Sequence, residues 1–279
     1  MKKQWLSVPY GIWALVFSIA PILIIAVYSF CSRSSYGNII YQFTTENYRN
    51  FLEPIYINVL WRSILLATQS TLACFILGYP MAMIIAKSKI KRRNIMVMLF
   101  VLPLWTNFLL RTYAWMVLLR DQGVINQFLM NIGIIDEPLK LLYSHNAVLL
   151  GMVYNFLPFM VLPIYSVLSK LDQSFVEAAE DLGAPPWQVF SKVIFPLSLP
   201  GVISGAIMVF MPAVSTFVIS DLLGGGQTVL LGNLIQNQFL VARNWQFGSA
   251  ISMIMIAMIL ITMGITSKYQ GEGGGRQLW

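Results

Sequence analysis

Three carboxylates, a glycine, two adjacent prolines and a tryptophan fall within residues 177–190, EAAEDLGAPPWQVF, between two long apolar runs. Ser174 and Glu177 have the Ser-x-x-Glu spacing of a capping box, in which each side chain accepts a backbone amide hydrogen of the other residue. Gly183 is typical of the position after a helix C-terminus, and the Pro-Pro pair at 185–186 suits a first helical turn. The spacing predicts two short helices with a sharp bend at Gly183.

The two predicted helices differ in the bulk of their faces. Leu182, Trp187 and Phe190 supply large apolar side chains, whereas Ala178 and Ala179 leave a low surface. A helix with apolar knobs can insert into a groove on a partner protein. The alternative is a helical loop that packs only on its own membrane domain, and the residue types alone leave both interpretations open.

Residues typical of catalysis or metal binding are scarce elsewhere. His145 is the single histidine, and the two cysteines, Cys31 and Cys74, are interpreted as free thiols. The chain has no G-x-x-x-x-G-K-[ST], H-E-x-x-H or G-x-S-x-G motif, and acids are nearly missing from its apolar runs. We therefore expect the chain to have no catalytic residue and no metal site. We expect it to be neither an enzyme nor a proton-driven carrier. Energy for uphill transport would enter through another subunit.

The composition is that of an integral membrane protein. The 279 residues are 57% hydrophobic and 10% charged, with a mean hydropathy of +0.71, whereas soluble domains carry about 25% charged residues. Backbone groups in lipid must pair internally, so the spans are helices and the fold class is all-α. We predict a single transmembrane domain over residues 1–279 with six spans at 8–30, 63–86, 95–119, 146–168, 199–221 and 247–267. The outer segments also predict short helices at 44–54 and 122–131.

Basic residues orient these spans. Five of the 18 Lys and Arg lie within KSKIKRR at 87–93, between two apolar runs. We interpret the net charge of +7 as a positive-inside signal and not as a nucleic-acid surface. With six spans, both termini and segment 169–198 are then cytoplasmic. The first apolar run is longer than a signal-peptide core, so we expect it to stay as a span.

The polar stretch resembles the EAA motif of ABC importer permeases. Glu177-Ala178-Ala179, then Gly183, then Val193-Ile194-Phe195-Pro196 fit that family's spacing throughout, with Val and Phe replacing Ile and Leu. Longer segments, among them LPLWTNFLLRTYAW at 102–115 and SDLLGGG at 220–226, resemble the polyamine branch, the permeases of spermidine/putrescine importers.

This resemblance implies a type I, MetI-like permease in a bacterial inner membrane. It implies that the 169–198 loop docks on a dimer of ATP-binding subunits, which bind ATP and Mg²⁺ while this chain holds no cofactor. It also implies a second permease subunit and a periplasmic binding protein that meets segments 31–62, 120–145 and 222–246. The residues expected to couple to the ATPase are Glu177, Ala178, Ala179, Gly183, Trp187, Phe190 and Pro196.

A polyamine path should offer carboxylates and aromatic faces, because cations bind both. Asp221 closes the fifth apolar run, where a negative charge at a helix C-terminus is disfavoured and suggests a nearby cation. Trp105, Tyr113 and Trp115 lie on the third run, and Asn107 could supply a neutral hydrogen bond. Ordinary interfacial positions are the alternative for Asp221 and for the aromatic residues.

The role of Arg111 and the identity of the cargo are each open to alternatives. Arg111 is expected to serve a structural pairing, with Asp221 or with an acid of a partner subunit, because a cationic wall would repel polyamine. An importer for thiamine, ferric ion or an oxyanion stays open, although an anion path should be richer in Arg and Lys. A secondary transporter that works without ATP is the alternative of a different class.

Overall fold

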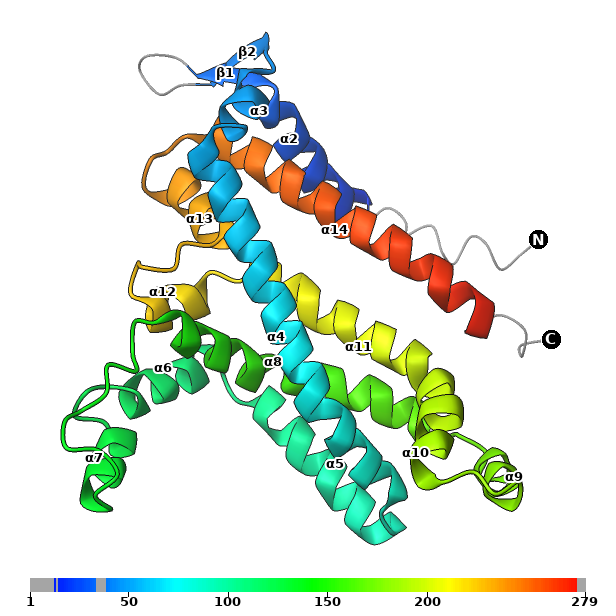
Figure 1. The fold of residues 1–279 in the computed structure, drawn as a ribbon. Coiled ribbons are helices and arrows are strands. Elements are labelled where there is room, and N and C mark those ends of the chain that lie inside the picture. The colour runs from blue at the N-terminus through cyan, green and yellow to red at the C-terminus, as the bar shows by residue number, and fades with distance from the viewer. Residues whose placement is uncertain (1–12, 14, 34–38, 275–279) are drawn as a thin grey trace, which may run out of the picture.

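The computed structural model describes residues 13, 15–33 and 39–274 of the chain (Figure 1). A single antiparallel hairpin, β1 (Cys31–Arg33) and β2 (Ile39–Phe43), interrupts an otherwise helical fold within these ranges. The helices are η2 (Leu15–Ile19), α2 (Ala20–Ser29), α3 (Glu46–Phe51), α4 (Pro54–Lys87), α5 (Ile90–Trp105), α6 (Phe108–Leu118), α7 (Val124–Asn131), α8 (His145–Leu168), α9 (Ser174–Asp181), α10 (Pro186–Val189), η3 (Phe190–Ile194), α11 (Phe195–Ser215), α12 (Val218–Gly224), α13 (Leu231–Leu240) and α14 (Trp245–Gly274).

The core lies where α4, α8 and α11 pack together (Figure 1). Met152, Met160 and Ile164 on α8 are fully buried there. Two glycines four residues apart let α11 approach α8 closely. A Cβ atom at Gly201 would lie 2.9 Å from the carbonyl oxygen of Pro163, and one at Gly205 would lie 2.9 Å from the Met160 sulfur. Small residues at this spacing are the usual means of close helix packing in membranes, where no hydrophobic force drives helices together.

Four helices are long and apolar enough to cross a membrane, among the residues that the structure describes: α4, α8, the continuous Pro186–Ser215 helix and the Trp245–Gly264 part of α14. The first predicted span, 8–30, corresponds in its described part to the shorter apolar helix Leu15–Ser29, and residues 8–12 lie outside the described ranges. The protein is therefore a multi-pass membrane protein, and α2 packs along α14.

The third predicted span, 95–119, is not one straight helix. It is divided into α5 and α6, which meet at an angle of 93° around Thr106 and Asn107. Pro103 lies one turn before the break and cannot donate a backbone hydrogen bond. The break carries two polar residues, Thr106 and Asn107, but the flanking residues are apolar enough for hydropathy to predict one span.

The fifth predicted span, 199–221, is wrong at both ends. The helix begins at Pro186, because α10, η3 and α11 follow one another without interruption, and it ends at Ser215. The second short helix predicted from the Pro-Pro pair is thus the start of the span and not a separate element. Asp221 falls in the separate helix α12, so it does not close the fifth span.

The two ends of the bundle carry different elements (Figure 1). One end carries α9, the α4–α5 turn with its basic residues, and the end of α14. The other carries α7, α12 and the β1–β2 hairpin. The predicted short helices of the outer segments are present as α3 and α7, whereas the hairpin was not predicted. Segment 169–198 is therefore at the same end as the KSKIKRR block, as the sequence predicted.

Candidate functional site

The bent helix pair, residues 172–190, is here called the elbow. Its first helix is capped by a residue other than the one predicted. The carboxylate of Asp172 accepts the backbone amide of Ser174 at 3.0 Å, and Ser174 is already the first helical residue. The backbone and hydroxyl of Ser174 both donate to this carboxylate and hold its pKa below the usual value of 3.8. The predicted Ser174 cap is therefore wrong, because the residue before the helix is Gln173, which forms no side-chain cap bond; the helix itself was predicted correctly.

The bend at Gly183 follows the predicted chemistry. Gly183 has a φ of +80°, in the left-handed region that side chains other than glycine rarely adopt. Its amide donates to the carbonyl of Glu180 at 2.8 Å, and the amide of Ala184 donates to the carbonyl of Ala179 at 3.1 Å. These two bonds form a Schellman motif, which satisfies the last carbonyls of α9 and reverses the chain.

One face of the elbow is buried and the other is exposed. Val176, Val189 and Ile194 form a small apolar cluster that fixes the elbow to the end of α8. On the opposite face, Glu177 and Ala178 are exposed. The exposed fractions are 89% for Leu182 and 72% for Trp187, large values for apolar side chains in the segment that projects beyond the spans. This arrangement is a membrane-anchored helix pair with an unpaired apolar tip.

Phe190 and Pro196 lie away from this tip. Phe190 is partly buried, and its ring meets that of Tyr79 edge-on at 5.7 Å. The Tyr79 hydroxyl donates to Ser198 Oγ at 2.8 Å, because the single Ser198 proton is directed to the carbonyl of Phe195. Pro196 is at the start of α11 within the continuous helix. Phe190 therefore connects the elbow to α4, a role that residue types alone did not indicate, whereas Pro196 is exposed.

The break between α5 and α6 is closed by side chains. Asn107 caps α6, its Oδ1 accepting the amide of Leu109 at 2.8 Å. The carbonyl of Pro103 accepts the backbone amide of Thr106 at 3.2 Å, the Thr106 hydroxyl at 2.7 Å and a guanidinium N–H of Arg111. Arg111 therefore bridges the break within its own segment. Within the described ranges it forms no ion pair with Asp221, so the predicted pairing with that residue is absent.

The break between α5 and α6 separates Trp105, on α5, from Tyr113 and Trp115, on α6. Trp105, 79% exposed, ends α5 and lines a pocket of about 330 Å³ with Val101, Leu102 and Tyr165 among others. Tyr113 on α6 is 44% exposed. Trp115 packs edge-on against Tyr154 of α8, with ring centroids 5.4 Å apart. Trp115 is thus a packing residue, whereas Trp105 and Tyr113 present free faces.

Asp221 belongs to a hydrogen-bonded network centred on Asn233. Asn233 is buried and uses both sides of its amide: Oδ1 accepts from Ser220 at 2.7 Å and from the Leu230 amide at 2.9 Å, and Nδ2 donates to the Phe217 carbonyl and to Asp221. The Asp221 carboxylate is exposed on its other side. Its partner is a neutral amide on α13 and not the cation that the sequence suggested.

The same network fastens α13 to α4. Ser63 Oγ accepts the amide of Leu231 at 2.7 Å and donates to the carbonyl of Val59 at 2.8 Å. Asn233 and Ser63 are more than 160 positions apart, and neither was a candidate. Their polarity within apolar surroundings is the only signal that could have drawn attention to them.

The structure does not gather the path candidates into one site. Asn107 and Asp221 are on the neighbouring elements α6 and α12, which pack together, while Trp105 ends the preceding helix. No hydrogen bond joins Asp221 to the other four candidates in the described part of the chain. Among the same residues, no group of three or more His, Cys, Asp or Glu side chains could hold a metal ion.

Comparison with known proteins agrees with this architecture. Residues 75–268 match the family described as "Binding-protein-dependent transport system inner membrane component". The spermidine/putrescine transport system permease protein PotB of Haemophilus influenzae is 41% identical, covering 89% of this chain and 88% of that protein. PotB of Escherichia coli K12 is 42% identical and covers 91% and 90%.

Solved structures share the fold at low identity. A chain of a bacterial ABC transporter involved in the import of the acidic polysaccharide alginate superposes with a TM-score of 0.77 at 16% identity and covers 96% of each chain. A chain of the MetNI methionine ABC transporter, in inward-facing conformations, gives a TM-score of 0.56 at 15% identity, covering 79% of this chain and 98% of that one.

Proposed function

We propose that this chain, which belongs to the binding-protein-dependent transport system inner membrane component family, takes up spermidine and putrescine as a permease subunit of an ATP-driven importer in a bacterial inner membrane. The observation that carries the proposal is an identity of 41–42% to PotB proteins over about nine-tenths of both chains. The alginate and methionine transporters, at 15–16% identity, bear only on the fold.

ATP is hydrolysed in this proposal by separate subunits that dock on the elbow. The exposed Leu182 and Trp187 supply apolar area for that contact, and Glu177 on α9 is exposed as well. Movement of the docked subunits would pass through Phe190 and Tyr79 into α4 and, directly, into the continuous helix that begins at Pro186. The chain itself supplies no catalytic group and binds neither ATP nor Mg²⁺.

The transport path lies between this chain and a second permease, with polyamine handed over by a periplasmic binding protein. Trp105, Tyr113 and Asp221 are the candidates whose side chains stay accessible for a cation. Asn107 is engaged in capping and Trp115 in packing, so we rank both below these three. Asp221→Asn should lower polyamine uptake, and unchanged uptake would remove Asp221 from the path.

The proposed cargo is tested by uptake of labelled spermidine in cells with and without the chain, in a strain lacking other polyamine importers. Unlabelled putrescine, thiamine and sulfate serve as competitors. We expect uptake that requires the chain and is inhibited by putrescine alone. Uptake that does not depend on the chain, or that thiamine or sulfate inhibits equally, would contradict the polyamine assignment.

A further inference from the structure

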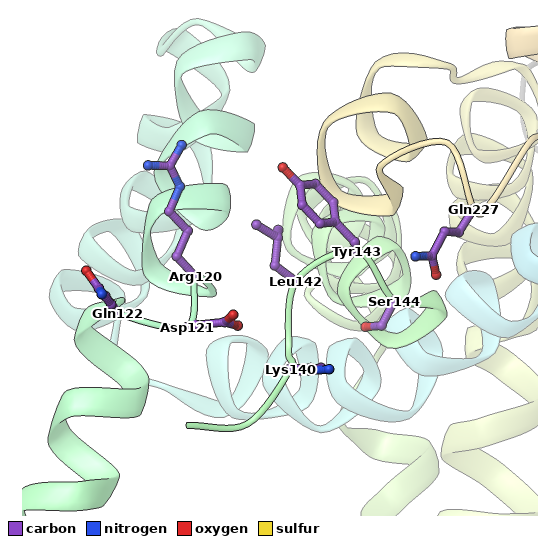
Figure 2. Close-up of a pocket in the computed structure, with 8 residues that line it drawn as sticks. All are labelled: Arg120, Asp121, Gln122, Lys140, Leu142, Tyr143, Ser144 and Gln227. Atoms are coloured by element: carbon purple, nitrogen blue, oxygen red, sulfur yellow. The ribbon is translucent and has the colours of Figure 1, made fainter. Parts of the chain in front are cut away.

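A pocket of about 660 Å³ opens at the end of the bundle opposite the elbow (Figure 2). It lies beside the first residue of α8, whereas the elbow follows the last, and a helix of 24 residues spans about 36 Å. Figure 2 shows Arg120 and Asp121 on one side of the hollow, Tyr143 and Gln227 on the other, and Lys140 between them. The pocket is thus on the outer face if the elbow is cytoplasmic.

The walls of this pocket are held together by one buried side chain. Asn126 is fully buried, and its Nδ2 donates to the backbone carbonyls of Arg120, at 3.2 Å, and Leu139, at 2.9 Å. Its Oδ1 accepts the Leu139 amide at 3.0 Å. The backbones that carry Arg120 and Lys140 are therefore fixed relative to each other before any partner binds. Such preorganisation reduces the entropy lost on binding.

The charges of the lining favour an anion. Arg120 and Lys140 are opposed by a single acid, Asp121, and the other polar lining residues are neutral. In the described part of the chain, neither Arg120 nor Lys140 forms an ion pair. Gln227 also lines a neighbouring pocket of about 250 Å³, together with Arg62 and His145. The guanidinium of Arg62 is a further positive charge beside the first pocket.

The excess of positive charge in the lining disfavours polyamine, the proposed cargo, and favours an anionic ligand. A polyamine carries only positive charge, so a lining with more bases than acids repels it. A carboxylate side chain matches the Arg120–Lys140 pair, because guanidinium and ammonium groups donate strong charge-assisted hydrogen bonds to carboxylates. A partner that presents a carboxylate at the outer face would gain both affinity and orientation.

We propose that the Arg120–Lys140 pocket receives an acidic side chain of the periplasmic binding protein and so fixes its register on this subunit. The inference rests on the proposed function, which supplies that partner. The carboxylate enters between Arg120 and Lys140, and the neutral side chains of Ser144 and Gln227 complete its surroundings. Asp121 limits the attraction, so the binding protein can leave after it has released its cargo.

The test uses the complete transporter in nanodiscs and the polyamine-loaded binding protein. The double variant Arg120→Glu/Lys140→Glu changes side chains only, and the Asn126 clamp, which uses backbone atoms of residues 120 and 139, stays intact. We expect the Kd of the binding protein to rise about tenfold or more, with a weaker dependence on salt. ATPase activity without the binding protein should not change.

Asp121→Asn is the matched control, because it alters the adjacent residue in the opposite electrostatic direction. It should leave binding unchanged or tighten it about twofold to threefold. Wild-type affinity in the double variant, or equal weakening by Asp121→Asn, would overturn the proposal. A defect seen only in nanodiscs with phosphatidylglycerol would also overturn it and indicate a lipid headgroup site. If the wild-type transporter binds no polyamine-loaded protein, the proposed function itself fails.

Discussion

The elbow and the opposite end of the bundle, which is the outer end if the elbow is cytoplasmic, are stabilised in opposite ways. The elbow depends on backbone hydrogen bonds around Gly183 and a small apolar cluster, and it leaves Leu182 and Trp187 exposed. The outer end depends on buried polar side chains: Asn126 and Asn233 join segments 13 and 16 positions apart, and Ser63 bonds Leu231, 168 positions away. Polar networks that are fully satisfied rigidify what they connect. The contrast indicates that the outer end is a finished scaffold, whereas the elbow becomes complete only when a partner covers its tip.

The largest expected effect is on transport. Glu177→Lys, or Gly183→Pro, should reduce polyamine uptake to background while the binding protein still binds cargo. Proline cannot adopt the φ of +80° found at Gly183 and lacks the amide that bonds Glu180. Uptake is measured in cells that contain equal amounts of each variant. Asp181→Lys, a similar charge change on the same helix, is the control and should retain most uptake; full uptake in both test variants would contradict the coupling role.

A change at the outer end should instead act on stability. Asn233→Ala leaves the buried Leu230 amide without its acceptor, whereas the Phe217 carbonyl keeps the Asp221 amide and the Ser220 hydroxyl. The substitution should lower the free energy of unfolding by about 1–3 kcal/mol. Thermal unfolding of the detergent-solubilised protein measures this. Glu177→Lys is the comparison, because an exposed side chain should leave the unfolding temperature nearly unchanged. If the two variants unfold alike, the two ends do not differ as described.

Substitutions at the junction between the elbow and α4 should have an intermediate effect, on the coupling of ATP hydrolysis to transport. Tyr79→Phe keeps the ring packing against Phe190 but removes the hydroxyl that donates to Ser198, at a cost of about 1 kcal/mol. We expect the ratio of ATP hydrolysed to polyamine transported to rise in proteoliposomes, because the connection to α4 is weaker. Ser198→Ala removes the same bond from the other side and should reproduce the change. An unaltered ratio in both variants would exclude this connection as a transmission route.

The smallest effect concerns the start of the elbow. Hydrogen bonds from Ser174 lower the folded-state pKa of Asp172. The stabilisation that the ionised Asp172 gives the fold is therefore present above the unfolded-state pKa, near 3.8. It is lost as the pH falls through the lower folded-state pKa. Asp172→Asn keeps a capping oxygen and should leave uptake unchanged near neutral pH. Asp172→Ala should lower uptake slightly through fraying of α9. A pH profile of uptake that shifts near neutrality in Asp172→Asn would contradict this account.

Local signals predicted the elbow well. Gly183 and the Pro-Pro pair act within a few residues, so the bend follows from backbone preferences alone. The cap was misassigned because Asp172 and Ser174 can both accept backbone amides at a helix start, and sequence does not decide at which residue the helix begins. Hydropathy identified the apolar helices, and charge placed the elbow at the same end as the KSKIKRR block, because both report on the membrane and not on a particular contact. The six-span count and the cytoplasmic side of the elbow stay predictions.

Tertiary features were beyond local reasoning. The break at Thr106 lies inside a continuous apolar run, and the Arg111 bond to Pro103 becomes visible only once the chain has bent. Asn233 bonds Ser220 on α12, and the adjacent Leu231 amide bonds Ser63 on α4, pairings that no spacing rule predicts. The placement of Asp221 failed because the fifth span ends earlier, at Ser215, where Thr216 adopts an extended backbone.

The uninterrupted helix from Pro186 to Ser215 has the form of a lever. Its 30 residues span about 45 Å, and its tightest contacts with α8, at Gly201 and Gly205, fall near the middle. A pivot there would convert a tilt of about 10° into opposite displacements of about 4 Å at the two ends. A push on Trp187 would then move Ser215, and with it the start of α12, in the reverse direction. The permease would need no flexible relay to open one side as it closes the other.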